Sequence, residues 1–292
     1  MKQPGRVAEN NRSPQARPRR LAFWVPPLAV FALVVGLWYA VTYLLLEPDR
    51  RFLLPPPHAV VRVAFGNTAN LSELLHALLL SAGVAAAGLG IAVVIGMTTA
   101  IAMSQARWVE RSLYPYFVVL QTVPVLALVP LFGFWFGFGL TSRVLVCVLV
   151  ALFPIVANTL FGLLSVDDAY HDLFSLHGAG RFPRLVKLQL PAALPAIFTG
   201  LRISAGLSVI GAIVGDFFFK QGDPGIGILI DLYRQRLQSE QLFGAVILSS
   251  LLGVAVFVAF GALARRVTGS WHSSVRDREA TPDRFLRLSP PE

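Results

Sequence analysis

The stretch VDDAYHDLFSLHGAGRFPRLVKLQLPAALP, residues 166–195, is a polar interruption between long hydrophobic runs. Its first apolar residues recur with the i, i+3, i+4, i+7, i+8 spacing of an amphipathic helix, and Asp167 or Asp168 can cap the start of that helix. Gly178 follows and is expected to end it. The stretch therefore predicts a polar helix and a glycine turn in a chain that is otherwise mostly apolar.

A second short helix is predicted directly after this turn, from about residue 182 to residue 189. Pro183 is tolerated in its first turn, and Leu190-Pro191 is expected to end it. Basic side chains recur every third residue along one face, at Arg181, Arg184 and Lys187. We therefore expect a helix–glycine–helix element with a basic face.

The rest of the chain has the composition of a membrane protein. Of its 292 residues 55% are hydrophobic and only 14% are charged, against roughly 25% charged in soluble domains. Uncharged runs cover residues 21–46, 77–106, 112–142, 144–166, 203–215 and 241–264. Most exceed the ~20 residues that cross a bilayer core. The short fifth run is extended to residue 219, which leaves Asp216 near a membrane face.

The predicted fold class is therefore all-α, a polytopic integral membrane protein. We expect one transmembrane domain over residues 21–268, with six helices at about 23–46, 77–104, 112–136, 143–165, 201–219 and 242–264. The basic segment of residues 1–20 is predicted to be a disordered tail, and residues 269–292 a flexible one.

The distribution of Lys and Arg predicts the orientation of the chain. With the N-terminus inside, 18 of the 25 basic residues lie on the cytoplasmic side and 7 lie outside. Both termini and residues 166–195 are therefore predicted to be cytoplasmic, in a multi-pass protein of the cell (inner) membrane. Because the basic residues sit beside helix ends, the net charge of +9 does not indicate nucleic-acid binding.

Several residues inside the predicted spans are candidates for a translocation path. The third span contains prolines, and its helix is predicted to be kinked and then broken near residues 137–139. Irregular backbone at membrane depth is tolerated where it is buried or lines a wet cavity, although prolines are also common in packed membrane helices. Asn158 and the small residues of the fifth span serve equally well as packing groups. The path candidates are Pro124, Pro130, Asn158, Ser204 and Ser208.

The fifth span also contains Gly211-x-x-x-Gly215, which allows another helix to approach closely. Asp216, directly after it, is expected at the outer boundary, paired or hydrated. It stands alone in the sequence, without the second intramembrane acid of a proton relay, which weakens the case for an ion-coupled carrier. An amphipathic outer helix is predicted after it, with Ile226, Ile230 and Tyr233 on one side.

Motifs of catalysis are missing from the sequence. None of the three lysines follows a glycine, so there is no phosphate-binding loop and the chain is not expected to hydrolyse ATP. No nucleophile elbow or H-E-x-x-H motif occurs. His171 and His177 are a poor metal pair, and the single cysteine, Cys147, lies in an apolar run. No cofactor, metal site or enzymatic activity is expected.

The opening stretch resembles the cytoplasmic loop of bacterial ABC-importer permeases, which reads E-A-A, three residues, G, nine residues, I-x-L-P. Here the order is Asp172-Leu173-Phe174, three residues, Gly178, nine residues and Leu188-Gln189-Leu190-Pro191. The spacing matches throughout, while Asp replaces Glu and larger apolar residues replace both alanines.

The resemblance extends over roughly residues 50–270. LLPPPHAVV, at residues 53–61, is similar to the segment after the first helix of the nitrate, sulfonate and taurine permease group. Further similar stretches are residues 107–111, 114–132, 153–159 and 192–202. By these motifs the chain is identified as a member of that group, with its MetI-like permease fold.

The resemblance implies a six-helix subunit in the membrane lipid that forms a homodimer, two ABC ATPases on the cytoplasmic loops and an extracytoplasmic substrate-binding protein. The residues that would transmit force from the ATPase are Asp172, Gly178, Arg181, Leu190 and Pro191. The implied solute is a sulfonate or taurine, nitrate, or a compound like a thiamine-pyrimidine precursor or riboflavin. The alternatives are a multi-pass membrane enzyme or scaffold and an ion-coupled carrier.

Overall fold

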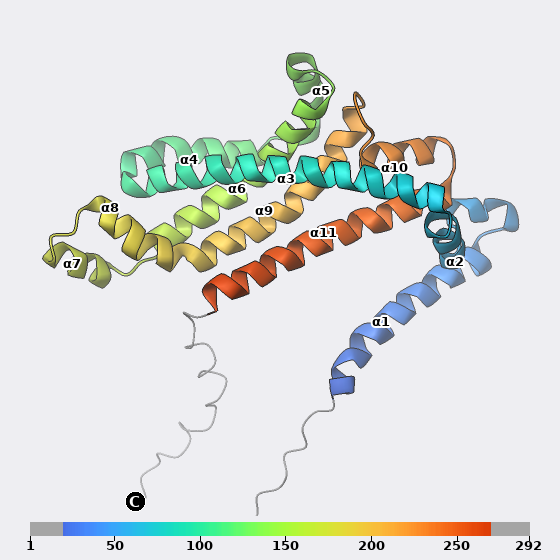
Figure 1. Ribbon diagram of the computed structural model, residues 1–292, viewed down its shortest axis with the longest axis horizontal. Helices are drawn as coiled ribbons and strands as arrows, with labels where there is room; N and C mark the ends of the chain where they lie inside the picture. Colours follow the sequence, from blue (N-terminus) through green and yellow to red (C-terminus); the bar gives the residue numbers. More distant parts are fainter. Residues whose placement is uncertain (1–19, 270–292) are drawn as a thin grey trace, which may run out of the picture. The chain divides into compact units, whose positions relative to one another are not determined.

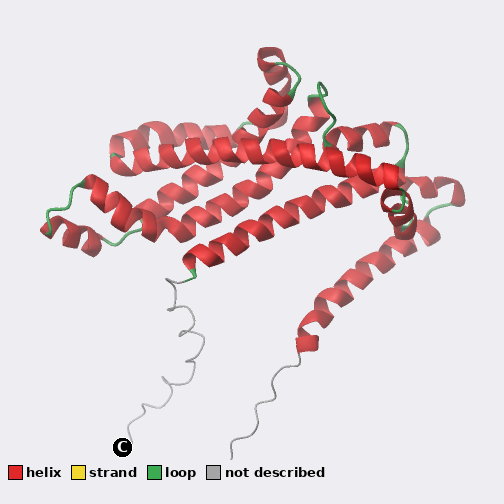
Figure 2. Ribbon diagram, in the orientation of Figure 1, coloured by secondary structure: helices red, strands yellow, loops and turns green. Residues whose placement is uncertain are grey.

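The computed structural model describes residues 20–269, and every regular element within this range is helical (Figures 1 and 2). The two predicted tails lie outside the described residues, apart from Arg20 and Gly269. The α-helices are α1 (Arg20–Ala40), α2 (Pro57–Val60), α3 (Thr68–Gln105), α4 (Arg107–Thr122), α5 (Val125–Phe136), α6 (Leu140–Leu164), α7 (Asp168–Leu176), α8 (Arg181–Arg184), α9 (Leu190–Phe218), α10 (Ile226–Gln235) and α11 (Ser239–Thr268). The all-α prediction is confirmed.

Five helical segments among the described residues are long and apolar enough to cross a membrane, and the count rises to six if α4 and α5 together form one span. The segments are Val25–Leu45, Thr68–Gln105, Leu140–Leu164, Arg181–Phe218 and Ser239–Thr268. The chain divides after Ala59 into two compact units. In the first unit, Trp38 Nε1 donates to Pro55 O, and Thr42 donates to Leu54 O. These bonds tie the proline-rich segment to the end of the first span.

The second unit is built around α6 and α9, which pack antiparallel along their length. A Cβ at Gly211 would lie 3.0 Å from Cys147 Cα, and one at Gly215 would lie 3.1 Å from Arg143 Cα. The predicted close approach is therefore confirmed, and α6 is the helix that makes it. Helix α3 packs against both, with Gly88 facing Cys147. Small residues let the three backbones approach where larger side chains would separate them.

The third predicted span is kinked, as expected, and the structure shows where the kink lies. Helices α4 and α5 meet at Val123–Pro124 with a bend of 99°. Pro124 has no N–H to continue the helix and forces Val123 into an extended conformation, at φ −67° and ψ 127°. The predicted break near residues 137–139 is also confirmed, because α5 ends at Phe136 and α6 begins at Leu140. Pro115 and Pro130 remain within helices.

Leu190-Pro191 does not end the second helix of the polar stretch, contrary to the prediction. A π-helical turn at Leu185–Gln189 joins α8 to α9, and Leu190 keeps helical angles, at φ −62° and ψ −47°. The wider turn and the position of Pro191 in the first turn of α9 explain why its missing N–H leaves the helix unbroken. Residues 181–218 therefore form one continuous helical segment.

The predicted amphipathic outer helix is α10, with Ile226 and Tyr233 buried. Asp231 on α10 accepts hydrogen bonds from Lys220 and from Arg234 and Gln235. The bonds from Lys220 and then Arg234 lower the pKa of Asp231 from 3.8 to about 2. This network fixes α10 to the segment that follows α9.

We expect the Asp231 network to stabilise the protein in a defined pH range. Because the folded-state pKa lies below the unfolded value, the contribution is complete above about pH 4 and is lost as the pH falls to about 2. Thermal unfolding of the purified protein in detergent, compared with Asp231→Asn, measures it. The difference between the two proteins should shrink over this window; a constant difference would contradict the assignment.

Candidate functional site

The polar stretch folds into two short helices around a glycine. Asp167 Oδ1 accepts from Ala169 N at 2.9 Å and so caps α7, as one of the two predicted alternatives has it. At the other end Gly178 N donates to Ser175 O, and Ala179 N donates to Phe174 O, both at 2.9 Å. Gly178 has φ +65°. A helix that ends in a left-handed residue favours glycine at that position. The prediction that Gly178 ends the first helix is therefore confirmed, and its positive φ is the reason.

A side-chain contact holds the two halves of the stretch together. Arg184 Nη2 on α8 donates to Ser175 Oγ on α7 at 2.9 Å. Helix α8 continues through the π-helical turn into α9, so the hydrogen bond from Arg184 links α7 to the start of a long apolar helix. We call residues 166–195 the handle, because this stretch is attached to the start of α9.

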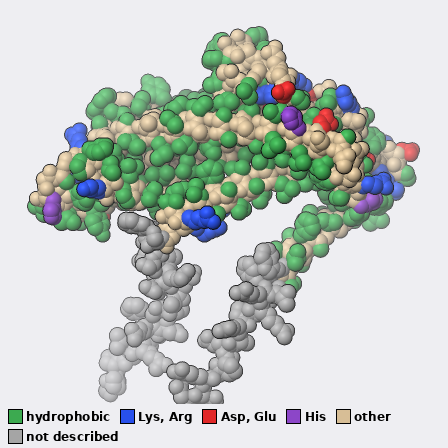
Figure 3. Space-filling view, viewed as in Figure 1, with side chains coloured by type: hydrophobic (Ala, Val, Ile, Leu, Met, Phe, Trp, Pro, Cys, Tyr) green, Lys and Arg blue, Asp and Glu red, His purple; other side chains and the backbone are tan. Residues whose placement is uncertain are grey.

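The outward surface of this handle is apolar. Leu176 is 86% exposed and Phe182 is 75% exposed, and Tyr170 and Leu173 are also exposed. Hydrophobic side chains cover much of the visible face, as expected for lipid contact, and charged side chains are few on it (Figure 3). Exposed apolar side chains on a polar, amphipathic helix differ from that lipid-facing surface and indicate contact with another protein.

The five predicted site residues occupy different parts of this element. Asp172, Gly178 and Arg181 are exposed on or beside the two short helices. Leu190 and Pro191 are half-buried at the start of α9. The structure thus brings the predicted residues into one element but divides them between its outward surface and its root.

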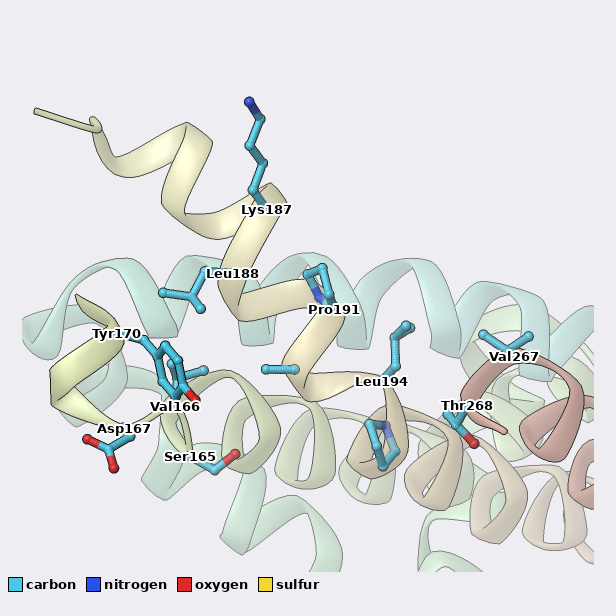
Figure 4. Close-up of a pocket in the computed structure, with 12 residues that line it drawn as sticks. Ser165, Val166, Asp167, Tyr170, Lys187, Leu188, Pro191, Leu194, Val267 and Thr268 are labelled. Carbon is cyan, nitrogen blue, oxygen red and sulfur yellow. The ribbon is translucent and has the colours of Figure 1, made fainter. Parts of the chain in front are cut away.

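A cavity of about 460 Å³ lies at the root of the handle (Figure 4). Its walls come from the start of α7, the start of α9 and the end of α11, namely Ser165, Val166, Asp167, Tyr170, Lys187, Leu188, Pro191, Ala192, Leu194, Pro195, Val267 and Thr268. The Lys187 side chain extends away from the other labelled residues (Figure 4). The mostly apolar walls suit a protein side chain better than an ion.

The candidate path residues are not gathered at one place. Pro124, at the bend between α4 and α5, lines a cavity of about 260 Å³ together with Ile210 and Val214 of α9. Pro130 is exposed on α5. The other three serve packing: Asn158 Nδ2 donates to Pro154 O at 2.8 Å, Ser204 Oγ donates to Ala151 O at 2.6 Å, and Ser208 Oγ donates to Ala205 O at 2.9 Å.

A second polar cluster lies at the other end of α6 and α9, and the sequence analysis missed most of it. Arg143 Nη1 lies 3.3 Å from Asp216 Oδ1, with side chains only 3% and 0% exposed. Asp216 is therefore paired with Arg143, which confirms the first of the two alternatives expected for it, paired or hydrated. Its partner Arg143 lies shortly after a glycine-rich turn. A basic residue at such a place is read from the sequence as a marker of membrane orientation, and nothing there points to an ion pair.

Helix α3 and the start of α10 complete this cluster. Ser81 Oγ donates to Asp216 Oδ2 and accepts from Ile226 N at 2.8 Å, and Gly227 N donates to Asp216 Oδ2 at 3.3 Å. A Cβ at Gly225 would collide with the Asp216 carboxylate. The run Gly222–Gly227 in the sequence is the one signal that could have revealed such a close approach.

No group of three or more His, Cys, Asp or Glu side chains within residues 20–269 is arranged to hold a metal ion. The second unit is thus a helical bundle with exposed apolar side chains on the short helices at one end and a buried ion pair at the other.

Comparison with known proteins agrees with this description. Residues 92–269 match the family described as binding-protein-dependent transport system inner membrane component. The formylaminopyrimidine transport permease ThiX of Halalkalibacterium halodurans is 35% identical over 235 residues, which are 80% of this chain and 90% of the relative. The putative aliphatic sulfonates transport permease SsuC of Escherichia coli K12 is 31% identical over 90% of this chain and 96% of the relative.

A third relative carries a different solute in its name. The riboflavin transport permease RibX of Chloroflexus aurantiacus is 35% identical over 58% of this chain and 62% of the relative. The shared family and the helical, multi-pass architecture agree with the resemblance found at residues 166–195. The chain therefore belongs to the binding-protein-dependent transport system inner membrane component family, the multi-pass inner-membrane permeases of ABC importers.

Proposed function

We propose that this permease receives the force of ATP hydrolysis, carried out by a separate ABC ATPase, through the handle of residues 166–195. The observation that supports the proposal is the exposure of Leu176 on α7 and of Phe182 on α8, the short helix that continues into α9. An apolar knob of this kind fits a groove on a soluble partner. Asp172, Gly178, Arg181, Leu190 and Pro191 are the residues through which the motion passes.

In this proposal, closure of two ATPases moves two handles, and each handle rocks its α9 within the bundle. The permease acts as a homodimer, and the path runs where the α4–α5 bend faces α9. Pro124 and Ile210 line a cavity at that place, which supports the assignment. Pro130 lies on the same bent pair. Ser204 supports the path from behind by joining α9 to α6, and Asn158 and Ser208 do so through bonds within α6 and α9 respectively.

Both termini and the handle are cytoplasmic in the proposed orientation, and an extracytoplasmic binding protein delivers the solute at the opposite end. The solute is a small compound of the kinds that the relatives carry, an aliphatic sulfonate such as taurine, nitrate, or a pyrimidine or flavin related to thiamine or riboflavin. ATP-dependent uptake of labelled taurine, nitrate, formylaminopyrimidine and riboflavin in proteoliposomes would select among them. Uptake without any ATPase would indicate an ion-coupled carrier instead.

Replacement of the apolar knob tests the proposed coupling. Leu176→Asp should reduce capture of the ATPase by the purified permease at least about tenfold, because a charge would have to enter an apolar groove. Leu237→Asn is the matched control: Leu237 is also exposed and apolar, but it lies at the other end of the bundle, and its φ of +54° suits asparagine. Equal capture by both variants would contradict the proposal.

A further inference from the structure

We propose that Arg143, Asp216 and Ser81 form an outer clasp that passes the motion of α9 to the bent helix α5. They act as positioning residues, and none of them contacts the solute. The inference rests on the proposed function, since it requires that α9 be moved at its handle. It adds the contacts through which the movement passes from the far end of α9 to α5.

The first link of the clasp joins α9 to α6. Asp216 lies two residues before the end of α9, the helix that continues without interruption from the handle. Its carboxylate faces Arg143, and both side chains are almost completely buried. Removing one partner of such a pair leaves an uncompensated buried charge, so a substitution of either residue alone should disturb the contact between the two helix ends.

The second link joins Arg143 to the segment after α9. Its guanidinium donates to three backbone carbonyls, from Nε to Phe219 O at 2.8 Å, from Nη2 to Gln221 O at 3.0 Å and from Nη1 to Asp223 O at 3.1 Å. The planar fork of arginine can serve three acceptors at once, whereas the compact ammonium of lysine cannot spread its donors in this way. Arg143 therefore binds the loop after α9 at three points between residues 219 and 223.

The third link reaches α5. Gln221 N donates to Phe138 O at 3.0 Å, directly after the end of α5. The Phe138 ring lies against Phe219, with ring centroids 6.2 Å apart, and covers Gly133 of α5. Elsewhere α5 packs mainly on α6 and has a highly exposed tip at Phe134 and Trp135. The loop held by Arg143 therefore adds a polar connection between α5 and the end of α9, beside the apolar cluster that contains Val129 and Phe219.

Stability alone does not account for this arrangement. Well-packed apolar residues often replace a buried ion pair without loss of stability, so the pair is weak evidence for a stabilising role. The clasp instead unites four elements at one point: α3 through Ser81, α6 through Arg143, α9 through Asp216, and α10 through the amides of Ile226 and Gly227. Such a point makes the outer ends of these helices move together.

Hydrogen–deuterium exchange tests the clasp in the reconstituted complex of permease and ATPase, with and without ATP and vanadate. Peptides covering residues 170–180 report the handle, and peptides covering residues 132–142 report α5. In the unaltered protein, nucleotide should change exchange at both places. In Asp216→Asn the change at the handle should remain while the change at α5 is lost.

Two further variants separate transmission from folding. Arg143→Gln combined with Asp216→Asn leaves no unpaired charge, so the protein should fold while α5 stays unresponsive. Arg143→Lys keeps the ion pair but not the grip on three carbonyls, and it should also lose the response at α5. A normal response at α5 in all three variants would overturn the clasp. Absence of any response at the handle in the unaltered protein would instead overturn the proposed docking.

Discussion

Gly178→Pro is expected to abolish both association with the partner ATPase and ATP-driven transport. Gly178 has φ +65°, whereas proline is fixed near −65°, so the chain cannot keep its path after α7. Proline also lacks the N–H that Gly178 donates to Ser175 O. The second short helix would leave α7, and the apolar knob would lose its shape. Capture of the ATPase and ATP-dependent uptake measure the effect.

A graded series at the same position sharpens this prediction. Gly178→Asn should be tolerated best, because asparagine visits the left-handed region, and Gly178→Ala should weaken the turn by roughly 1–2 kcal/mol. Gly180→Ala is the control: Gly180 has φ −67°, and a Cβ there would have only Pro183 Cδ nearby, at 4.0 Å. Activity that survives in Gly178→Pro, or is lost equally in Gly180→Ala, would contradict a role for the left-handed turn.

Gly225→Ala is expected to have a comparably large effect at the opposite end of the bundle. The backbone at Gly225, with φ −78° and ψ 173°, would accept alanine without strain. Its new Cβ would, however, collide with the Asp216 carboxylate. Overpacking of this kind costs about 1–3 kcal/mol by itself. Displacement of Asp216 would also leave Arg143 buried beside no carboxylate, so both thermal stability and transport should fall.

The control for this substitution is another glycine of the same unit. Gly83 lies within α3, and a Cβ there would meet nothing within 4 Å. Gly83→Ala should therefore be neutral or should stabilise the helix by up to about 1 kcal/mol. Thermal unfolding in detergent compares the two variants. If Gly225→Ala were as stable as the unaltered protein, the cluster would accommodate the new methyl group and the prediction would be wrong.

The sequence predicts most of the helical framework because hydropathy and helix signals are local properties. Gly178 indicates its turn directly, and the small residues at Gly211 and Gly215 correctly predict close helix packing. The kink in the third span was predicted without a position, because three prolines compete in one span, and only the packed structure shows that Pro124 decides it.

Long-range contacts explain the remaining differences. Arg143 has most of its partners among backbone carbonyls about 80 positions away, and backbone groups carry no sequence signature. Arg202 was counted among the cytoplasmic basic residues, yet it lies within α9, with its guanidinium 3.6 Å from the centre of the Phe257 ring. In both cases the partner lies far away in the sequence, so a count of charges along the chain cannot identify it.

Because α9 is continuous, the number of residues between its contacts cannot change without moving some of them. Gly200, Ser204, Gly211, Gly215 and Asp216 meet their partners at successive points along one helix. A single inserted residue would turn everything beyond it by about 100° and would shift it by about 1.5 Å. Asp216 would then point away from Arg143 while the handle stayed in place. We therefore expect natural variation in length to fall in the loops and tails of this protein, and the interval from Gly178 to Asp216 to be kept at its present number of residues.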